Sequence, residues 1–166
     1  SFEIKKIDQN INNLILFYGK NEGLKNETIS ILVKDKSNIS RYEEKEILDN
    51  ENYFIESILS KSLFEQNKFI IVKRATDKIL KLVEILHLKN LDETTIILIS
   101  DNLEKKSKLR SLFEKDKKLV CIPFYPDNDQ TLSKLAYNFL REKQISISTS
   151  NINLIVNKCS GDREKL

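Results

Sequence analysis

The sequence predicts an α/β fold, in which a parallel sheet is covered by helices on both faces and is followed by a purely helical region. Three observations predict it. Short apolar runs, unbroken by polar residues, alternate with amphipathic helical patterns, which is typical of parallel strands buried on both faces. Pro123 and Pro126 then interrupt the series, because proline continues neither a central strand nor a helix interior. Beyond them the apolar spacing is helical only.

The composition is that of an ordinary globular protein. The 166 residues suit one medium domain, or one domain with a piece of the next, and 40% of them are hydrophobic and 32% charged. No apolar run is long enough to cross a bilayer and no secretory leader is present, so we expect a cytoplasmic protein without membrane contact. The net charge of +3 permits contact with nucleic acid without arguing for it. Because residues 162–166 resemble the opening turn of a helix, we expect the chain to be a fragment.

The first predicted strand, Leu14–Tyr18, leads into a glycine loop and a helix that runs to about Val33. This layout is typical of a phosphate-binding loop, which requires the pattern G-x-x-x-x-G-K-[ST] because its lysine neutralises phosphate and its hydroxyl holds magnesium. Here Gly19 and Gly23 are one residue too close, and Leu24-Lys25-Asn26 stands where the lysine and hydroxyl are needed. We therefore predict the backbone layout of a phosphate-binding loop without the residues that bind phosphate and magnesium. The apolar side of the helix is predicted to comprise Leu24, Thr28, Ile31 and Leu32.

The remaining strands are short apolar runs, predicted at Ile39–Tyr42, Phe69–Val72, Thr95–Ile99 and Lys118–Ile122. A helix is predicted at Asp77–Leu88, where Thr76 or Asp77 can cap the first turn. A shorter helix carries Leu109, Leu112 and Phe113. After the prolines, two apolar stripes at helical spacing predict two more helices. The stripes comprise Leu132, Leu135, Ala136, Phe139 and Leu140, and then Ile152, Ile155, Val156 and Cys159.

The catalytic inventory is short. In an ATPase of this layout the third strand would end in adjacent acids that hold magnesium and orient water. Here it ends in Val72-Lys73-Arg74-Ala75, and Asp77 comes too late, where a helix-start role explains it better. Asp101 is interpreted as a turn and cap residue, and Glu43-Glu44 as a pair on a solvent face. Because no nucleophile and base occur together, we predict no catalytic, cofactor-binding or metal-binding residue, and no enzymatic activity for the chain by itself.

The remaining residues that could carry chemistry have structural explanations. Cys121 and Cys159 are far apart and lack a C-x-x-C partner, which favours buried thiols, and the lone His87 has no zinc-ligand spacing to either of them. A basic cluster could contact phosphate backbones, or it could be a solvated helix face. Its members are Lys105, Lys106, Lys108 and Arg110.

The segment Lys61–Arg74 contains the candidate binding residues. A helix is predicted at Asn52–Ser62. Its apolar stripe comprises Phe54, Ile55, Ile58 and Leu59. At about 100° per residue, Leu63 falls about 110° and Phe64 about 150° from the centre of that stripe if the helix continues. Two interpretations remain: the helix ends near Ser62 and both side chains pack under the sheet edge, or they form an exposed apolar plug for a pocket on another protein.

Several short motifs occur together, in the order and spacing of one family, over nearly the whole chain. They are Leu16-Phe17-Tyr18-Gly19-Lys20-Asn21-Glu22, Ser62-Leu63-Phe64 leading into Phe69-Ile70-Ile71-Val72, Leu109-Arg110-Ser111-Leu112-Phe113, Pro123-Phe124-Tyr125-Pro126-Asp127 and Gly161-Asp162-Arg163. Through these motifs the chain resembles the N-terminal part of the delta subunit of bacterial DNA polymerase III, a component of the clamp-loader complex and so of the polymerase holoenzyme.

The resemblance implies an AAA+-like (P-loop NTPase-like) domain in residues 1–126, without a functional P-loop. It also implies that residues 127–166 are the start of a small helical lid domain. A C-terminal collar domain, through which the other clamp-loader subunits would be contacted, is expected to be missing from this sequence. The family has lost ATP hydrolysis, in agreement with the absent Walker A and Walker B residues, so no cofactor is expected.

The resemblance further implies a partner. In the family, the Ser-Leu-Phe segment inserts its two apolar side chains into a pocket on the ring-shaped sliding clamp, the beta subunit, and helps to open the ring for loading onto DNA during replication. Ser62, Leu63 and Phe64 match that segment position by position. DNA is expected to be contacted only within the assembled complex. Two alternatives stay open: a degenerate nucleotide-binding AAA+ domain, or a DNA-binding module that uses the basic helix face.

Overall fold

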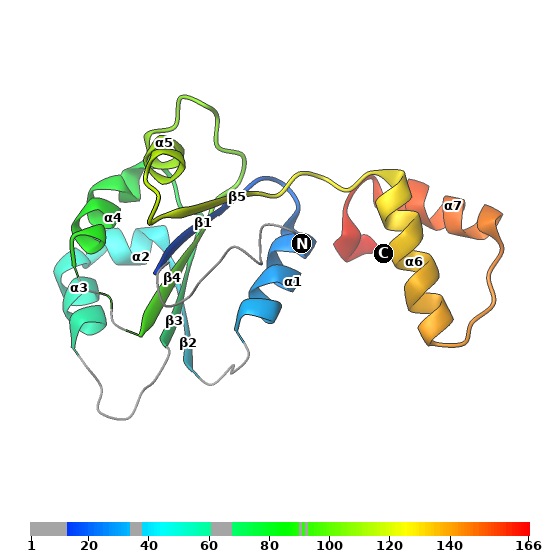
Figure 1. Ribbon diagram of the computed structural model, residues 1–166, viewed down its shortest axis with the longest axis horizontal. Helices are drawn as coiled ribbons and strands as arrows, with labels where there is room; N and C mark the ends of the chain where they lie inside the picture. The colour runs from blue at the N-terminus through cyan, green and yellow to red at the C-terminus, as the bar shows by residue number, and fades with distance from the viewer. Residues whose placement is uncertain (1–12, 34–37, 61–67, 90, 92) are drawn as a thin grey trace. The chain divides into compact units, whose positions relative to one another are not determined.

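The computed structural model describes residues 13–33, 38–60, 68–89, 91 and 93–166 (Figure 1). Contacts between Cα atoms divide the chain into two compact units. The sheet unit comprises residues 1–18 and 31–123, and the helical unit comprises residues 19–30 and 124–166. The loop after the first strand thus belongs with the C-terminal residues, which the sequence did not predict. The domain boundary expected at residue 126 stays a prediction.

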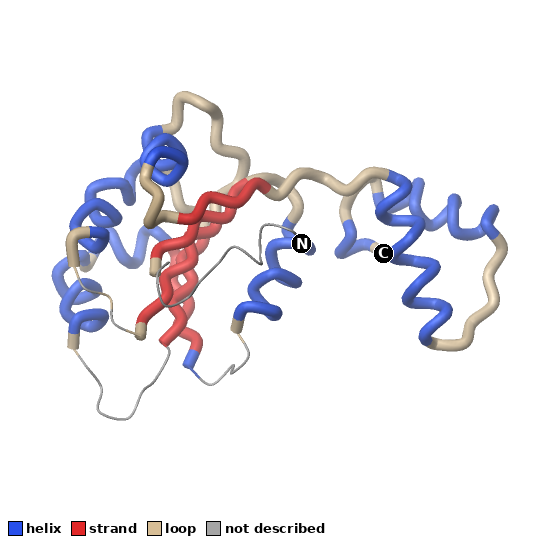
Figure 2. The backbone as a smooth tube through the Cα atoms, viewed as in Figure 1, coloured by secondary structure: helices blue, strands red, loops and turns tan. Residues whose placement is uncertain are grey.

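Among the described residues, the sheet unit contains five parallel strands, drawn in red in Figure 2. Their order is β2-β3-β4-β1-β5. The strands are β1 (Leu14–Tyr18), β2 (Ile39–Glu43), β3 (Lys68–Lys73), β4 (Thr94–Ile99) and β5 (Val120–Pro123). Leu16 of β1 lies opposite Leu98 of β4 on one side and Cys121 of β5 on the other. All side chains of β1 and β4 are buried, as expected of strands whose apolar runs do not alternate. The predicted parallel sheet is confirmed.

The helices of the sheet unit share one core with one face of the sheet. They are α2 (Glu44–Asp49), α3 (Glu51–Leu59), the 3-10 helix η3 (Asp77–Ile79), α4 (Leu80–His87) and α5 (Lys108–Lys115). In this core Leu16 and Leu98 pack with Leu86 of α4, and burial of each such side chain contributes about 1.5–3 kcal/mol. Phe17 and Ile97 alternate with these strand residues, so they point to the opposite face, and they are buried too. Both faces of the sheet are therefore covered.

Two local predictions were wrong around α2 and α3. The helix expected at Asn52–Ser62 ends earlier, because α3 stops at Leu59 and Ser60 has an extended backbone. Helix α2 was not predicted at all. Its first residue, Glu44, was expected on a solvent face but is buried, and its Oε1 accepts hydrogen bonds from the Thr76 backbone N–H (2.7 Å) and hydroxyl (3.0 Å).

The helical unit contains two capped helices. They are α6 (Asp129–Glu142) and α7 (Thr149–Cys159), followed by the 3-10 helix η4 (Arg163–Lys165). The Asn128 side chain caps α6 by accepting from the Thr131 backbone N–H, and Ser148 caps α7 in the same way. The two helices share a small core of Leu132, Ala136, Ile152, Val156 and Cys159. Phe139, expected on the inward stripe, is instead 58% exposed.

Helix α1 (Glu22–Leu32), which begins within the helical unit, buries a side that overlaps the predicted one only at Thr28. Lys25, Thr28 and Ile29 are buried, whereas Ile31 is 55% exposed. The prediction followed apolar residues only and therefore could not place a lysine on the inward side. Lys25 can lie there because its ammonium group pairs with Glu22 one turn earlier, as the burial of a charge requires.

Candidate functional site

The predicted clamp-binding residues Ser62, Leu63 and Phe64 lie outside the described residues, between α3 and β3. Because α3 ends at Leu59, the helical projection from which Leu63 and Phe64 were expected to point away from the core does not apply. The motif therefore stays a prediction that rests on its match to the family.

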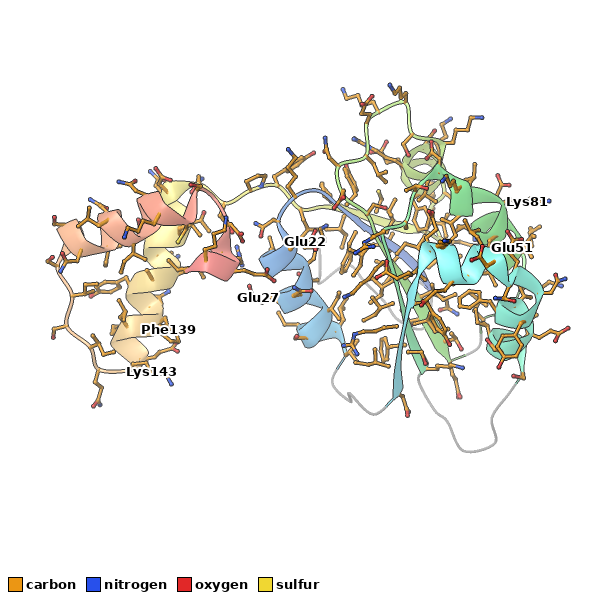
Figure 3. The ribbon with its side chains drawn as sticks, turned by 180° about the vertical axis from the view of Figure 1, so that it is seen from behind. Glu22, Glu27, Glu51, Lys81, Phe139 and Lys143 are labelled. Atoms are coloured by element: carbon orange, nitrogen blue, oxygen red, sulfur yellow. The ribbon has the colours of Figure 1, made fainter. Side chains whose placement is uncertain are left out.

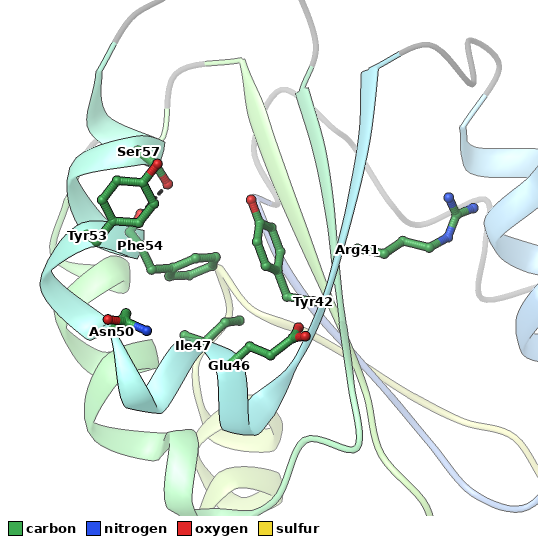
Figure 4. Close-up of a pocket in the computed structure, with 8 residues that line it drawn as sticks. All are labelled: Arg41, Tyr42, Glu46, Ile47, Asn50, Tyr53, Phe54 and Ser57. Carbon is green, nitrogen blue, oxygen red and sulfur yellow. Dashed lines mark hydrogen bonds between the residues drawn. The ribbon is translucent and has the colours of Figure 1, made fainter.

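An open pocket lies on the helices that precede this segment (Figure 4). It has a volume of about 420 Å³ and is lined from β2, α2 and α3. The rings of Tyr42 and Phe54 meet edge to face within it, with centroids 5.4 Å apart, and Tyr53 is 76% exposed. Glu46, its one carboxylate, accepts a hydrogen bond from the Glu43 backbone N–H (2.8 Å) in the cap of α2. The lining thus offers apolar contact area and no pairing of a nucleophile with a base.

The loop after β1 has the position of a phosphate-binding loop, but four backbone N–H groups of the loop and the first turn of α1 are already bonded. A phosphate loop presents N–H groups to the anion. Here Asn21 N–H donates to the Phe124 carbonyl (3.2 Å), and Glu22 N–H donates to a carbonyl of the loop (3.1 Å). The N–H groups of Leu24 and Lys25 donate to the Asn21 side chain (3.0 Å) and carbonyl (3.1 Å). Four donors that could cradle a phosphate are therefore used inside the chain.

The lysine and the first glycine of this loop also have internal roles. Lys25 is fully buried, and its Nζ lies 2.5 Å from Glu22 Oε1. Gly19 has φ +118°, and a Cβ at this position would lie 2.2 Å from the Phe124 carbonyl oxygen. Glycine is thus required here for a left-handed backbone and for a close approach of two chain segments. These features explain the glycine without a nucleotide.

The carboxyl end of β3 carries Lys73 and Arg74, and the nearby Asp77 has a structural role. Asp77 Oδ1 accepts hydrogen bonds from the Ser107 hydroxyl (2.6 Å) and the Leu109 N–H (3.0 Å), and Oδ2 accepts from the Lys108 N–H (3.1 Å). The Ser107 hydroxyl, followed by the Leu109 N–H, holds the pKa of Asp77 below its usual value. Asp77 does begin a helix, η3, but the side chain that caps η3 is Thr76, whose hydroxyl accepts from the Lys78 N–H. The Asp77 side chain instead accepts hydrogen bonds at the start of α5.

The four residues of the basic cluster do not share one helix face, so that part of the prediction was wrong. The cluster comprises Lys105, Lys106, Lys108 and Arg110. Lys105 and Lys106 are exposed in the turn before α5. Arg110 is largely buried, because it bonds Glu114 (2.7 Å) and its guanidinium lies 4.7 Å from the centre of the Tyr18 ring. Arg110 therefore supports the packing of α5, and only the lysines remain exposed for a phosphate backbone.

The histidine has a structural partner, and Cys159 is a core residue. His87 Nε2 lies 2.8 Å from Asp116 Oδ2 across the ends of α4 and α5. Cys159 is buried in the helical unit, whereas Cys121 is half-buried in β5. No group of three or more acidic, histidine or cysteine side chains is placed to hold a metal ion among the described residues. In the same part of the chain, no helix has the length and apolar character to cross a membrane.

One polar cluster was not predicted as a unit. Asn21, Asp127 and Arg163 come together within the helical unit, where the Asp127 carboxylate bonds both of the other side chains. The sequence analysis placed Asp127 and Arg163 in two separate family motifs, and neither motif pairs them. No local signal could have done so, because the partners lie far apart along the chain.

Comparison with known proteins identifies the fold. No protein-family profile and no curated protein sequence matches the chain. Among solved structures, the DNA clamp loader delta protein YqeN of Bacillus subtilis matches with a TM-score of 0.62 at 18% identity, over 99% of this chain and 54% of that chain. The replication initiator DnaA, bound to AMPPCP and single-stranded DNA, matches with a TM-score of 0.62 at 16% identity, over 99% of this chain and 57% of that chain. A variant of RuvB from Thermotoga maritima matches with a TM-score of 0.62 at 11% identity, over 99% and 55%.

These likenesses define the fold class: the chain has the AAA+-like fold shared by a clamp loader protein, DnaA and RuvB. The predicted AAA+-like fold is confirmed. The chain spans about half the length of the structures that it matches. Because the identities are low, the match to the clamp loader delta protein gives the fold, and the activity has to be argued from the residues.

Proposed function

We propose that this chain is the clamp-binding part of a delta-type clamp-loader subunit, which grips a sliding clamp through Leu63 and Phe64. The observation that carries the proposal is the motif Ser62-Leu63-Phe64 directly before β3, in a chain whose fold matches a clamp loader delta protein over 99% of its length. The partner is the ring-shaped clamp of DNA replication, and the chain acts in the cytoplasm. Other loader subunits would be bound through a C-terminal domain outside this sequence.

The site chemistry supports a binding protein and not an ATPase. Four N–H groups of the loop after β1 and the start of α1 bond inside the chain, and Lys25 is buried against Glu22. Strand β3 ends in Lys73 and Arg74, where an ATPase of this layout would carry acids that hold magnesium. The chain by itself therefore neither binds nor hydrolyses ATP in this proposal, and ATP acts through neighbouring subunits of the complex. DNA is contacted only in that assembly.

The proposed mechanism is a shift in the population of open rings. A clamp closed by subunit interfaces has a small open population, and a partner that binds the open form better raises that population by its differential affinity and no more. Burial of Leu63 and Phe64 in a pocket on the clamp would contribute about 3–6 kcal/mol before the costs of association. This gross energy is enough to anchor the chain while its other surfaces act on the ring.

The test is a binding titration of the 166-residue chain against the sliding clamp of the same organism. In the test variant, Leu63→Ala is combined with Phe64→Ala. The control variant combines Leu88→Ala with Phe139→Ala, which removes the same two side-chain types from positions that are 85% and 58% exposed. We expect the test variant to lose about a hundredfold or more in affinity, corresponding to about 2.7 kcal/mol, and the control to bind like the wild type. Equal binding by the test variant and the wild type would overturn the proposal.

Two further measurements separate the alternatives. A degenerate nucleotide-binding domain would bind ATP with magnesium in a calorimetric titration, whereas we expect no heat of binding. A DNA-binding module would bind duplex DNA with an affinity that falls steeply as salt rises, and Lys105→Glu with Lys106→Glu would abolish that binding. We expect the isolated chain to bind the clamp far more tightly than DNA.

A further inference from the structure

An ion-pair cluster joins the end of the helical unit to α1. Arg163 Nε and Nη2 donate to the two carboxylate oxygens of Asp127 at 2.7 and 2.6 Å, a bidentate pair. Its Nη1 donates to Glu27 Oε2 at 2.6 Å, and Figure 3 labels Glu27 on α1. The side chains of Arg163 and Asp127 are only 13% and 6% exposed. One guanidinium group therefore connects η4, the segment before α6, and α1 inside the helical unit.

The same carboxylate also holds the loop after β1. Asn21 Nδ2 donates to Asp127 Oδ2 (2.9 Å) and to the Tyr125 carbonyl (2.9 Å), and the Asn21 side-chain oxygen accepts from the Leu24 N–H. Asn21 is almost completely buried. The loop is thus fixed by two groups of the chain itself. They are the Asp127 carboxylate, which is an anion, and the Asn21 side-chain amide.

The space over the second glycine is filled as well. A Cβ added at Gly23 would lie 2.6 Å from Arg163 Cγ and 2.9 Å from Glu164 Cγ. The Asn26 side chain donates to Glu164 Oε1 (2.6 Å), a second tie between α1 and η4. The start of α1 is therefore covered by residues of the chain's own C-terminal segment, on the side where Gly23 has no side chain.

The electrostatics are consistent with a persistent pair. The guanidinium group of Arg163 lowers the pKa of Asp127, and the Asp127 carboxylate in turn raises the pKa of Arg163. Both groups are thus charged at neutral pH. Since Asp127 is largely buried, loss of Arg163 would leave its carboxylate without a countercharge.

We propose that Asp127, Arg163, Glu27 and Asn21 form a latch that, within the helical unit, holds the loop after β1 and the start of α1 to the C-terminal segment without a nucleotide. In a phosphate-binding loop, a bound anion engages the N–H groups at the start of the helix. Here four of the N–H groups in this position are bonded internally, and the latch ties the same loop to the C-terminal segment. The arrangement of the helical unit is therefore constitutive: it depends on Arg163 and does not respond to ATP. This inference is independent of clamp binding.

The test is hydrogen exchange of the full 166-residue chain, followed by mass spectrometry. Arg163→Ala removes the latch, and Arg141→Ala removes an exposed arginine of α6 in the same unit as a matched control. We expect Arg163→Ala to speed exchange about tenfold or more in residues 19–30 and 160–166, and Arg141→Ala to leave it unchanged. Exchange in β3 and β4 reports whether the sheet unit remains folded. Arg163→Gln, which keeps two donors, serves if the alanine variant does not fold, and we expect it to give a smaller increase in the same peptides.

A second experiment measures hydrogen exchange of the wild-type chain in the presence of millimolar ATP and magnesium. We expect no change in residues 19–30. Protection of these residues by ATP, or unchanged exchange in both Arg163 variants, would overturn the latch. A failed clamp titration would leave these readouts unaffected, because neither of them uses the clamp.

Discussion

Asp77 provides the sharpest test of whether an acid near the end of β3 serves structure or chemistry. Its carboxylate accepts three hydrogen bonds at the start of α5, from the Ser107 hydroxyl and the N–H groups of Leu109 and Lys108. Loss of a capping side chain costs about 0.5–2 kcal/mol, so we expect Asp77→Ala to lower the free energy of unfolding by about 1–2 kcal/mol at neutral pH. Asp101→Ala, which removes an exposed acid after β4, is the matched control and should change stability by less than about 0.5 kcal/mol.

The sign of the pH dependence of this stability difference follows from the direction of the pKa shift. The pKa of Asp77 is lowered in the folded chain, so its ionised form is favoured by folding. Its contribution is complete above the unfolded pKa, at about pH 4, and is lost as the pH falls through the lower folded pKa. Urea unfolding followed by circular dichroism should therefore show a stability difference between wild type and Asp77→Ala at pH 7 that shrinks in acid. The capping argument is refuted if the two proteins are equally stable at pH 7, or if the difference persists unchanged in acid.

Three further variants test the packing and the surface. Gly19→Ala should destabilise the chain by more than about 1 kcal/mol in urea unfolding, because the new methyl group would meet the Phe124 carbonyl oxygen at 2.2 Å and φ is +118°; a wild-type midpoint would contradict this. Phe113→Ala should cost about 3–5 kcal/mol in the same assay, since the ring is 2% exposed, and a loss below about 1 kcal/mol would show that the core around α5 is misplaced. Lys105→Glu with Lys106→Glu should leave the unfolding midpoint unchanged, because both side chains are exposed; a large shift would show that the turn carries a packing role.

The sheet could be predicted because its signal is local. The apolar runs that became β1 and β4 are unbroken, and burial on both faces explains why they do not alternate. Helix α2 carries no such signal: Ile47 is its one fully buried apolar residue, and its first residue, Glu44, is stabilised by Thr76 of a distant segment. A pattern of apolar residues cannot report a carboxylate whose burial depends on a remote hydroxyl.

In the candidate site, too, local features could be predicted from the sequence and long-range contacts could not. Sequence reasoning recognised that Gly19 and Gly23 are misplaced for a phosphate loop, because a motif is a local spacing. It missed that Asp127 and Arg163 bond each other beside that loop, because this contact arises only from the folding of the helical unit. Phe139 was misassigned for a related reason: an apolar residue at helical spacing faces a core only where another element packs against it, and this side chain is 58% exposed.

The position of β1 between β4 and β5 has a consequence for biosynthesis. Both neighbours of β1 come late in the chain, since Leu14 pairs with Ile96 and Ile15 pairs with Val120. The ribosome must therefore synthesise the chain through β5 before the earliest strand can acquire both partners. Until then a fully apolar segment emerges with two bare edges, the kind of intermediate that chaperones shield and that aggregates when synthesis stalls. Premature termination before β4 should thus yield insoluble material, and not a smaller folded domain.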